Sequence, residues 1–287
     1  MPMTSRERVE ATFRHGEPDR TPVFEYVLLS PVADRLDLAE MLGHDLMYLW
    51  PNPLPGRADT GPHAAPTAPA DDPVERLRRR NQEAAAADPS PPEESLRVYA
   101  LAKEEMARRG MDLPLLAPAY AHGVWTGVDL MMTMALEPEV AREHFALATQ
   151  RSLAAAEKYT ALGVDLIGVG GDFAGQRPII SPAAYRTFIV PEVRNVADRI
   201  HAAGRRAVNA SDGNQVTLLG NLDCGTTLSF ASPEEVWHHT IQCLKAGLGR
   251  GGHILCASNA ITASVPLENY LAVVQAHRDF FGLTSRT

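Results

Sequence analysis

The chain has few cysteines and no long apolar run. Its three cysteines, Cys224, Cys243 and Cys256, lie far apart without CxxC spacing, so neither a disulfide framework nor a zinc finger is indicated. No apolar run approaches the roughly 18 residues of a membrane span, and the N-terminus lacks the apolar core of a signal peptide. The sequence therefore predicts a cytoplasmic protein that does not enter a membrane.

Positive charge is also scarce. The 27 Lys and Arg residues are outnumbered by 35 Asp and Glu residues, which gives a net charge of −8, and the cations form no block. A surface of this kind does not attract nucleic acid or anionic membranes. Small molecules or proteins are the expected partners.

Hydrophobic residues are plentiful, at 45% of the 287 residues, which suffices for one large α/β domain over residues 1–287. Apolar runs alternate with helical patterns, which predicts a TIM (β/α)8-type barrel. Its expected strands are Val23–Leu29, Asp45–Trp50, Leu113–Ala119, Val164–Val169, Arg205–Ser211, Val216–Gly220 and Gly252–Ser258.

The run Val164–Val169 has no polar residue after Asp165, which is typical of a parallel strand buried on both faces. Two glycines and Asp172 follow it, and Ser181-Pro182 then predicts the start of a helix. Because catalytic residues of such barrels follow the carboxyl ends of strands, Asp172 is the first candidate for the site. The alternative is that Asp172 only caps its loop.

Other polar residues stand in or after expected strands. Glu25 interrupts the first strand, where a buried carboxylate is costly unless it is paired or lies at an open end, so it is either a site residue or a paired structural one. Tyr120 and His122 follow the third strand. His122 is either a proton donor or a surface or capping residue.

Seven prolines between Pro51 and Pro73 rule out a helix or a central strand there. The segment 51–73 is expected to be a long loop at the barrel mouth.

The barrel pattern breaks after Ser211. Only a few residues around Asp212-Gly213-Asn214 separate two extended runs, whereas parallel neighbours need a crossover of roughly a dozen residues or more. Either Asp212-Gly213 forms an antiparallel hairpin, or the strand Val216–Gly220 pairs elsewhere, for example in a partner chain.

Four segments together resemble the uroporphyrinogen decarboxylase family: SRERVEATFRHGEPDRTPV, DFAGQRPIISPAAY, GNLDCGTTLSFASPEEV and GGHILCASNAI. The resemblance covers nearly the whole chain and implies a TIM barrel with tetrapyrrole-related chemistry. The family includes a porphyrin-pathway decarboxylase that needs no metal, and zinc-dependent methyltransferases that demethylate corrinoid proteins.

Several family motifs do not carry over. The arginine-bearing segment after the first strand is replaced by EYVLLSPVAD, and the decarboxylase aspartate and histidine fall at about Pro51 or Asn52 and at Asn259. The zinc motif aligns with Asn209, Ser211 and Asn259, which are poor zinc ligands. The substrate is therefore not expected to be uroporphyrinogen, and no metal or cofactor is expected.

The family chain is also longer by about one βα unit, and the missing unit falls around residues 213–216. We therefore expect an incomplete barrel whose gap is covered by a partner subunit, as in a homodimer, by a rearranged hairpin or by the Pro-rich loop.

The first functional hypothesis is a metal-free lyase of the decarboxylase type that acts on a small anionic or tetrapyrrole-related substrate. The alternatives are a methyltransferase component that docks a corrinoid protein, and a catalytically impaired barrel scaffold. The candidate catalytic residues are Asp172, Asp212 and Asn259, and the candidate substrate-binding residues are Glu25, Tyr120, His122, Arg177, Asn209, Asn221 and Asp223.

Overall fold

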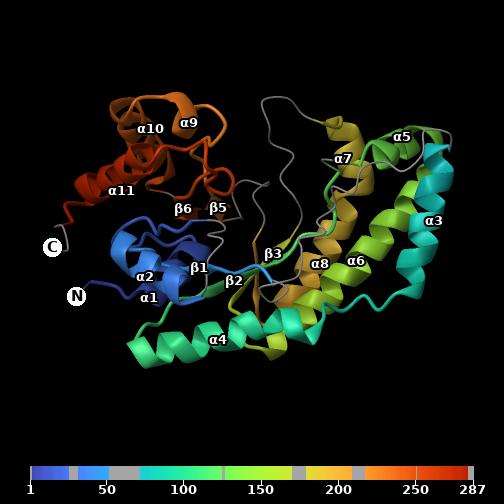
Figure 1. Cartoon of the computed structure of the whole chain (residues 1–287), viewed down its shortest axis with the longest axis horizontal. Helices are drawn as coiled ribbons and strands as arrows, with labels where there is room; N and C mark the ends of the chain where they lie inside the picture. The colour runs from blue at the N-terminus through green and yellow to red at the C-terminus, as the bar shows by residue number, and fades with distance from the viewer. Residues whose placement is uncertain are drawn as a thin grey trace. The chain divides into compact units, whose positions relative to one another are not determined.

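The computed structural model describes residues 2–25, 32–51, 72–124, 127–169, 179–208, 217–249 and 251–283 (Figure 1). Several residues singled out above lie outside the described ranges. These are Asp172, Arg177, Asn209 and Asp212, most of the Pro-rich segment, and residues 213–216, where the missing βα unit is expected. Their roles, and the missing unit, remain predictions.

Short parallel strands alternate with helices along the chain. The strands are β1 (Met47–Tyr48), β2 (Leu115–Ala119), β3 (Leu166–Val169), β4 (Arg206–Val208), β5 (Leu218–Leu219) and β6 (His253–Ile254). The helices are α1 (Ser5–Phe13), α2 (Val32–Leu42), α3 (Pro73–Ala86), α4 (Glu93–Arg109), α5 (Val128–Leu136), α6 (Pro138–Ala161), α7 (Pro182–Phe188), α8 (Val190–Ala202), α9 (Thr227–Phe230), α10 (Pro233–Gly247) and α11 (Leu267–Phe281).

The chain divides into two compact units. Unit 1 comprises residues 1–50, 98–116 and 209–287, and unit 2 comprises residues 51–97 and 117–208. Strand β2 begins in unit 1 and ends in unit 2.

In unit 1, β1 pairs in parallel with the start of β2, and β5 pairs in parallel with β6. Isolated parallel bridges join Val23 to Leu255 and Leu222 to Ala257. The partner of β5 is thus a parallel strand from the same chain, while the possible hairpin at Asp212-Gly213 lies outside the described residues. Because β5 and β6 run in the same direction, the residues that follow them leave from the same end.

The core of unit 1 lies between these strands and the last helices. Helices α10 and α11 pack side by side in Figure 1. The apolar residues buried there include Val23, Leu222, Leu228, Val236, Leu244, Leu255, Ala257, Val265 and Val273.

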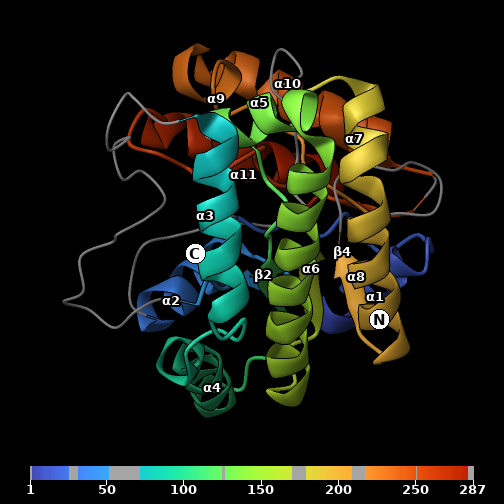
Figure 2. The same cartoon turned by 90° about the vertical axis from the view of Figure 1, so that its right-hand side faces the viewer.

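In unit 2, the end of β2, β3 and β4 are neighbours in that order, and β3 pairs in parallel with β4. Helices α3, α6 and α8 lie alongside one another in Figure 2. Glycine at position 168 of β3 suits the packing, because a Cβ there would overlap the outer part of the Tyr120 ring unless that side chain moved.

Helix α1 begins with a capping box. Its N-cap is Thr4, because the Thr4 side chain accepts from the Glu7 N–H while the Glu7 carboxylate accepts from the Thr4 N–H. The Ser5 hydroxyl donates to Asp45 at 3.0 Å.

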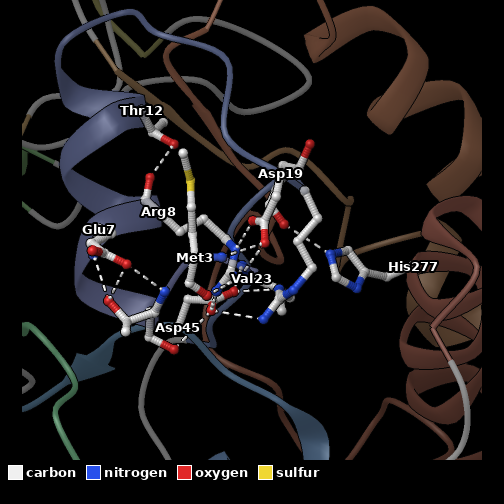
Figure 3. Close-up of polar contacts among 12 residues, drawn as sticks. Met3, Glu7, Arg8, Thr12, Asp19, Val23, Asp45 and His277 are labelled. Atoms are coloured by element: carbon white, nitrogen blue, oxygen red, sulfur yellow. Dashed lines mark hydrogen bonds and ion pairs between the residues drawn. The ribbon is translucent and has the colours of Figure 1, made fainter. Parts of the chain in front are cut away.

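Helix α1 closes the amino ends of the unit 1 strands through a buried ion network (Figure 3). Asp45, just before β1, is 0% exposed and accepts from Arg8 at 2.6 Å and from Arg20 at 2.5 Å. Arg8 is 4% exposed and also contacts Asp19 at 2.6 Å. Asp45 further accepts the Val23 N–H at 3.1 Å, so one carboxylate joins α1, the extended segment at Val23 and the start of β1.

No helix among the described residues is both long and apolar enough to cross a membrane.

Candidate functional site

The candidate site lies at the carboxyl ends of three strand segments in unit 1. The parallel bridges Val23 to Leu255 and Leu222 to Ala257 bring these ends together. Glu25, Asp223 and Asn259 each follow one of these segments, so they leave from the same end. In barrels of this type the carboxyl end is where catalytic residues gather.

Glu25 is the buried carboxylate of this group, at 8% exposed. Its Oε1 accepts the Ala257 N–H at 3.2 Å, and the Tyr270 hydroxyl from α11 hydrogen-bonds its carboxylate. Burial, and then the Glu25 charge, raise the pKa of Tyr270 well above its usual value. Tyr270 therefore keeps its proton and acts as the donor.

Cys224, which directly follows Asp223, hydrogen-bonds the loop after β6. Its N–H donates to the Ser258 hydroxyl at 3.1 Å, and its Sγ donates to the Asn259 carbonyl oxygen at 3.2 Å. Burial raises the pKa of the Cys224 thiol, and the nearby Glu25 charge raises it further. Cys224 is thus a neutral thiol at pH 7, and its hydrogen bonds join two loops of the site.

Three residues predicted from the sequence, Asp223, Asn221 and Asn259, lie near the carboxyl ends of these strand segments, and each makes different contacts. The Asp223 carboxylate accepts from the N–H groups of Gly225 and Thr226 and from the Thr226 hydroxyl, which lowers its pKa. Asp223 therefore shapes the turn into α9. Asn221 is exposed and donates its N–H to Cys243 Sγ. Asn259 is exposed, and its Oδ1 accepts the Ala260 N–H at 2.7 Å.

Sequence reasoning missed Tyr270, Cys224 and Ser258. Cys224 directly follows Asp223, so its position after a strand was a usable signal. Tyr270 lies in the last helix, far from any strand end in sequence, and no local pattern indicated it.

Tyr120 and His122 belong to unit 2. The Thr149 hydroxyl donates to Glu192 at 2.5 Å, and its oxygen lies 2.9 Å from His122 Nε2. Since Thr149 has one proton, His122 Nε2 must be the donor in that contact. His122 is 1% exposed, and burial, with Arg151 and His144, lowers its pKa to about 4. His122 is neither a surface residue nor a charged proton donor at neutral pH.

The methyltransferases of the resembled family bind zinc, so the side chains at this end of unit 1 can be compared with known zinc ligands. Asn259, at one expected ligand position, offers an exposed amide rather than a thiolate. Within the described ranges, no group of three or more His, Cys, Asp or Glu side chains is arranged to hold a metal ion. The described side chains therefore do not fit a zinc centre.

Comparison with known proteins agrees with the resemblance seen in the sequence. Residues 203–280 match the family profile described as Uroporphyrinogen decarboxylase (URO-D). A methylated-thiol–coenzyme M methyltransferase of Methanosarcina mazei is 26% identical over 198 residues, or 58% of this chain. The chain thus resembles the uroporphyrinogen decarboxylase family, most clearly over residues 203–280. The match to that methyltransferase spans about half of the relative, 53% of its length.

A solved structure described as a methyltransferase from Methanosarcina mazei shares the fold. It superimposes with a TM-score of 0.65 at 17% sequence identity, covering 97% of this chain and 99% of the other. The α/β, TIM-barrel-type fold expected from the sequence is thereby confirmed.

Proposed function

We propose that this chain is a methyltransferase-type member of its family, which transfers a methyl group from a methylated corrinoid to a small thiol. The observation that carries the proposal is the group of polar side chains at the carboxyl ends in unit 1, where Tyr270 hydrogen-bonds Glu25 and Cys224, which the Glu25 charge also affects, hydrogen-bonds Ser258. The methylated-thiol methyltransferase relative supports the reaction class, because its match extends over 198 residues.

The described side chains suit a reaction without a protein-bound zinc. They offer a carboxylate, two hydroxyls and a neutral thiol, which orient a substrate by hydrogen bonds and accept its proton. The corrinoid is the methyl donor and is carried by a partner protein.

The test mixes the purified chain with methylcobalamin, or with a methylated corrinoid protein, and 2-mercaptoethanesulfonate. We expect the methylcobalamin absorption band to decay and the methyl thioether to accumulate, as measured by mass spectrometry. Absence of the thioether with both donors would contradict the proposal.

A metal-free lyase is the second candidate, because a buried carboxylate hydrogen-bonded to a tyrosine is suited to proton transfer. Its test is release of carbon dioxide from candidate carboxylic acids in the presence of a chelator. Carbon dioxide release without methyl transfer would favour this candidate, and no turnover in either assay would favour an impaired scaffold.

A further inference from the structure

A directed chain of hydrogen bonds leads from the interior of unit 1 to the candidate site. Tyr270 Oη lies 3.3 Å from His44 Nε2 and also hydrogen-bonds Glu25. The tyrosine has a single proton, and an ionised carboxylate only accepts. The tyrosine proton therefore points to Glu25, and the tyrosine oxygen accepts from His44 Nε2.

His44 has the protonation state that this direction requires. It is buried, and burial lowers its pKa to about 4, an effect to which the neighbouring His277 adds. At neutral pH it is a neutral ring with one N–H, and that N–H is on Nε2. His44 thus fixes the orientation of the Tyr270 hydroxyl without adding a charge.

We propose that Glu25 is the proton acceptor of the site and that Tyr270, oriented by His44, is the positioning residue that holds the carboxylate ready. This inference rests on the proposed methyl transfer and names its acid–base residue. It includes two residues, Tyr270 and His44, that neither the sequence patterns nor the comparisons single out.

The chemistry balances with groups already named. A sulfur lone pair of the thiol forms the new S–CH3 bond, the Co–CH3 bond breaks, and its electron pair stays on cobalt, which goes from Co(III) to Co(I). The S–H proton passes to Glu25. Since the sulfur becomes positively charged as the S–C bond forms, its proton becomes strongly acidic, and a carboxylate of ordinary basicity suffices to accept it.

Tyr270 is needed because Glu25 is nearly buried. Burial favours the neutral form of a carboxyl group, whereas hydrogen bonds to the charged form oppose this. The Tyr270 hydroxyl and the Ala257 N–H supply such bonds. Among the residues that the structure describes, the other titratable groups whose charge affects this pair or is affected by it are Cys224, from the loop before α9, and Cys256, two residues after β6.

The first experiment does not depend on activity. Carboxyl 13C NMR follows the titration of Glu25, whose signal is assigned by its loss in Glu25→Gln. In wild type the carboxyl should be ionised at pH 7. In Tyr270→Phe its titration midpoint should rise by about one pH unit, which is a tenfold change.

Tyr99→Phe is the matched control. It removes a hydroxyl that is also buried in unit 1, but one that donates to the Leu49 carbonyl oxygen at 2.8 Å. The midpoint of Glu25 should stay at its wild-type value in this variant. A protonated Glu25 in wild type at pH 7, or equal midpoints in Tyr270→Phe and Tyr99→Phe, would overturn the positioning role.

The second experiment measures the rate of methyl transfer from methylcobalamin to 2-mercaptoethanesulfonate against pH. Glu25→Gln should lower the rate about 100-fold at all pH values. Tyr270→Phe should move the acidic limb of the profile up by the same pH unit, so that its loss is larger at low pH than at high pH. Tyr99→Phe should keep the wild-type profile.

The outcomes separate this inference from the proposed function. Methyl transfer that persists in Glu25→Gln would overturn the inference and leave the function standing. If wild type transfers no methyl group, the function and the proton-acceptor role both fail, while the NMR titration still decides whether Tyr270 controls Glu25.

Discussion

The described part of unit 1 contains two buried carboxylates at opposite ends of its strands, and they are held in different ways. Asp45, at the amino end, is bound by two guanidinium groups, Arg8 and Arg20. Glu25, at the carboxyl end, accepts from a backbone N–H and a tyrosine hydroxyl. Two guanidinium groups hold the Asp45 carboxylate in a fixed ion network, whereas Glu25 is bound by neutral donors. This difference supports a structural role for Asp45 and agrees with the proposed role of Glu25 as proton acceptor.

The largest expected loss of stability follows from replacing Asp45 at the amino ends of the strands. Asp45→Asn removes the buried carboxylate that Arg8 and Arg20 share and leaves only Asp19 beside Arg8, so the free energy of unfolding should fall by about 3–5 kcal/mol. Urea denaturation measures it. Glu25→Gln should cost only about 1 kcal/mol, because an amide oxygen still accepts from its neutral donors.

The control for Asp45→Asn is Asp112→Asn, which removes the partner of Arg6 on the same helix, α1. That pair is exposed, with 67% of the Asp112 side chain accessible, so the change should cost less than about 1 kcal/mol. If Asp45→Asn and Glu25→Gln lowered the free energy of unfolding equally, the two carboxylates would not differ in their contribution to stability.

The second effect is a pH dependence at the amino end. Burial lowers the pKa of His277 to about 4, below the usual 6.5, while its Nε2 donates to the Thr21 carbonyl oxygen at 2.8 Å. Above pH 6.5 both the folded and unfolded states are neutral at this residue, and no stability is lost. Between pH 6.5 and 4 the unfolded state takes up the proton first, so stability falls.

His277→Gln keeps an N–H donor and removes the titration. Between pH 7 and 4.5 wild type should lose about 2 kcal/mol more unfolding free energy than this variant, as measured by urea denaturation at both pH values. Parallel losses in the two proteins would show that His277 does not titrate as the structure implies.

A smaller effect concerns the carboxyl end. Asn269 on α11 is 2% exposed and donates to the carbonyl oxygens of Leu228 and Ala231 at 2.9 and 2.8 Å, which ties α9 to α11. Asn269→Ala should lower the free energy of unfolding by about 1–3 kcal/mol. Gln275→Ala, on the exposed side of the same helix, serves as the control and should change it by less than about 0.5 kcal/mol.

The smallest effect compares two capping boxes, Thr4/Glu7 on α1 and Ser232/Glu235 on α10. Because both use the same hydrogen bonds, Thr4→Ala and Ser232→Ala should each cost about 1 kcal/mol in thermal or urea denaturation. A much larger loss at Thr4 would mean that its cap also supports the network around Asp45.

The buried strands could be predicted from sequence because burial on both faces demands unbroken apolar runs. Leu115–Ala119 and Leu166–Val169 both fall within such runs. Glu25 could be singled out for the same reason, since a carboxylate inside an apolar run is costly unless something compensates for it. Asp223 fits the same pattern, but the structure uses its carboxylate to form a turn.

The sequence by itself determined the alternation of strands and helices, the family resemblance and the carboxylate inside an apolar run at position 25. These depend on local periodicity and on burial, which a linear pattern records. Only the tertiary structure decided that β5 pairs with β6 and that Asp45 binds Arg8 and Arg20. It also decided that Tyr270 hydrogen-bonds both Glu25 and His44. Each of these contacts joins residues far apart in the chain, and hydrogen bonds and ion pairs depend on distance in space, which sequence spacing does not give.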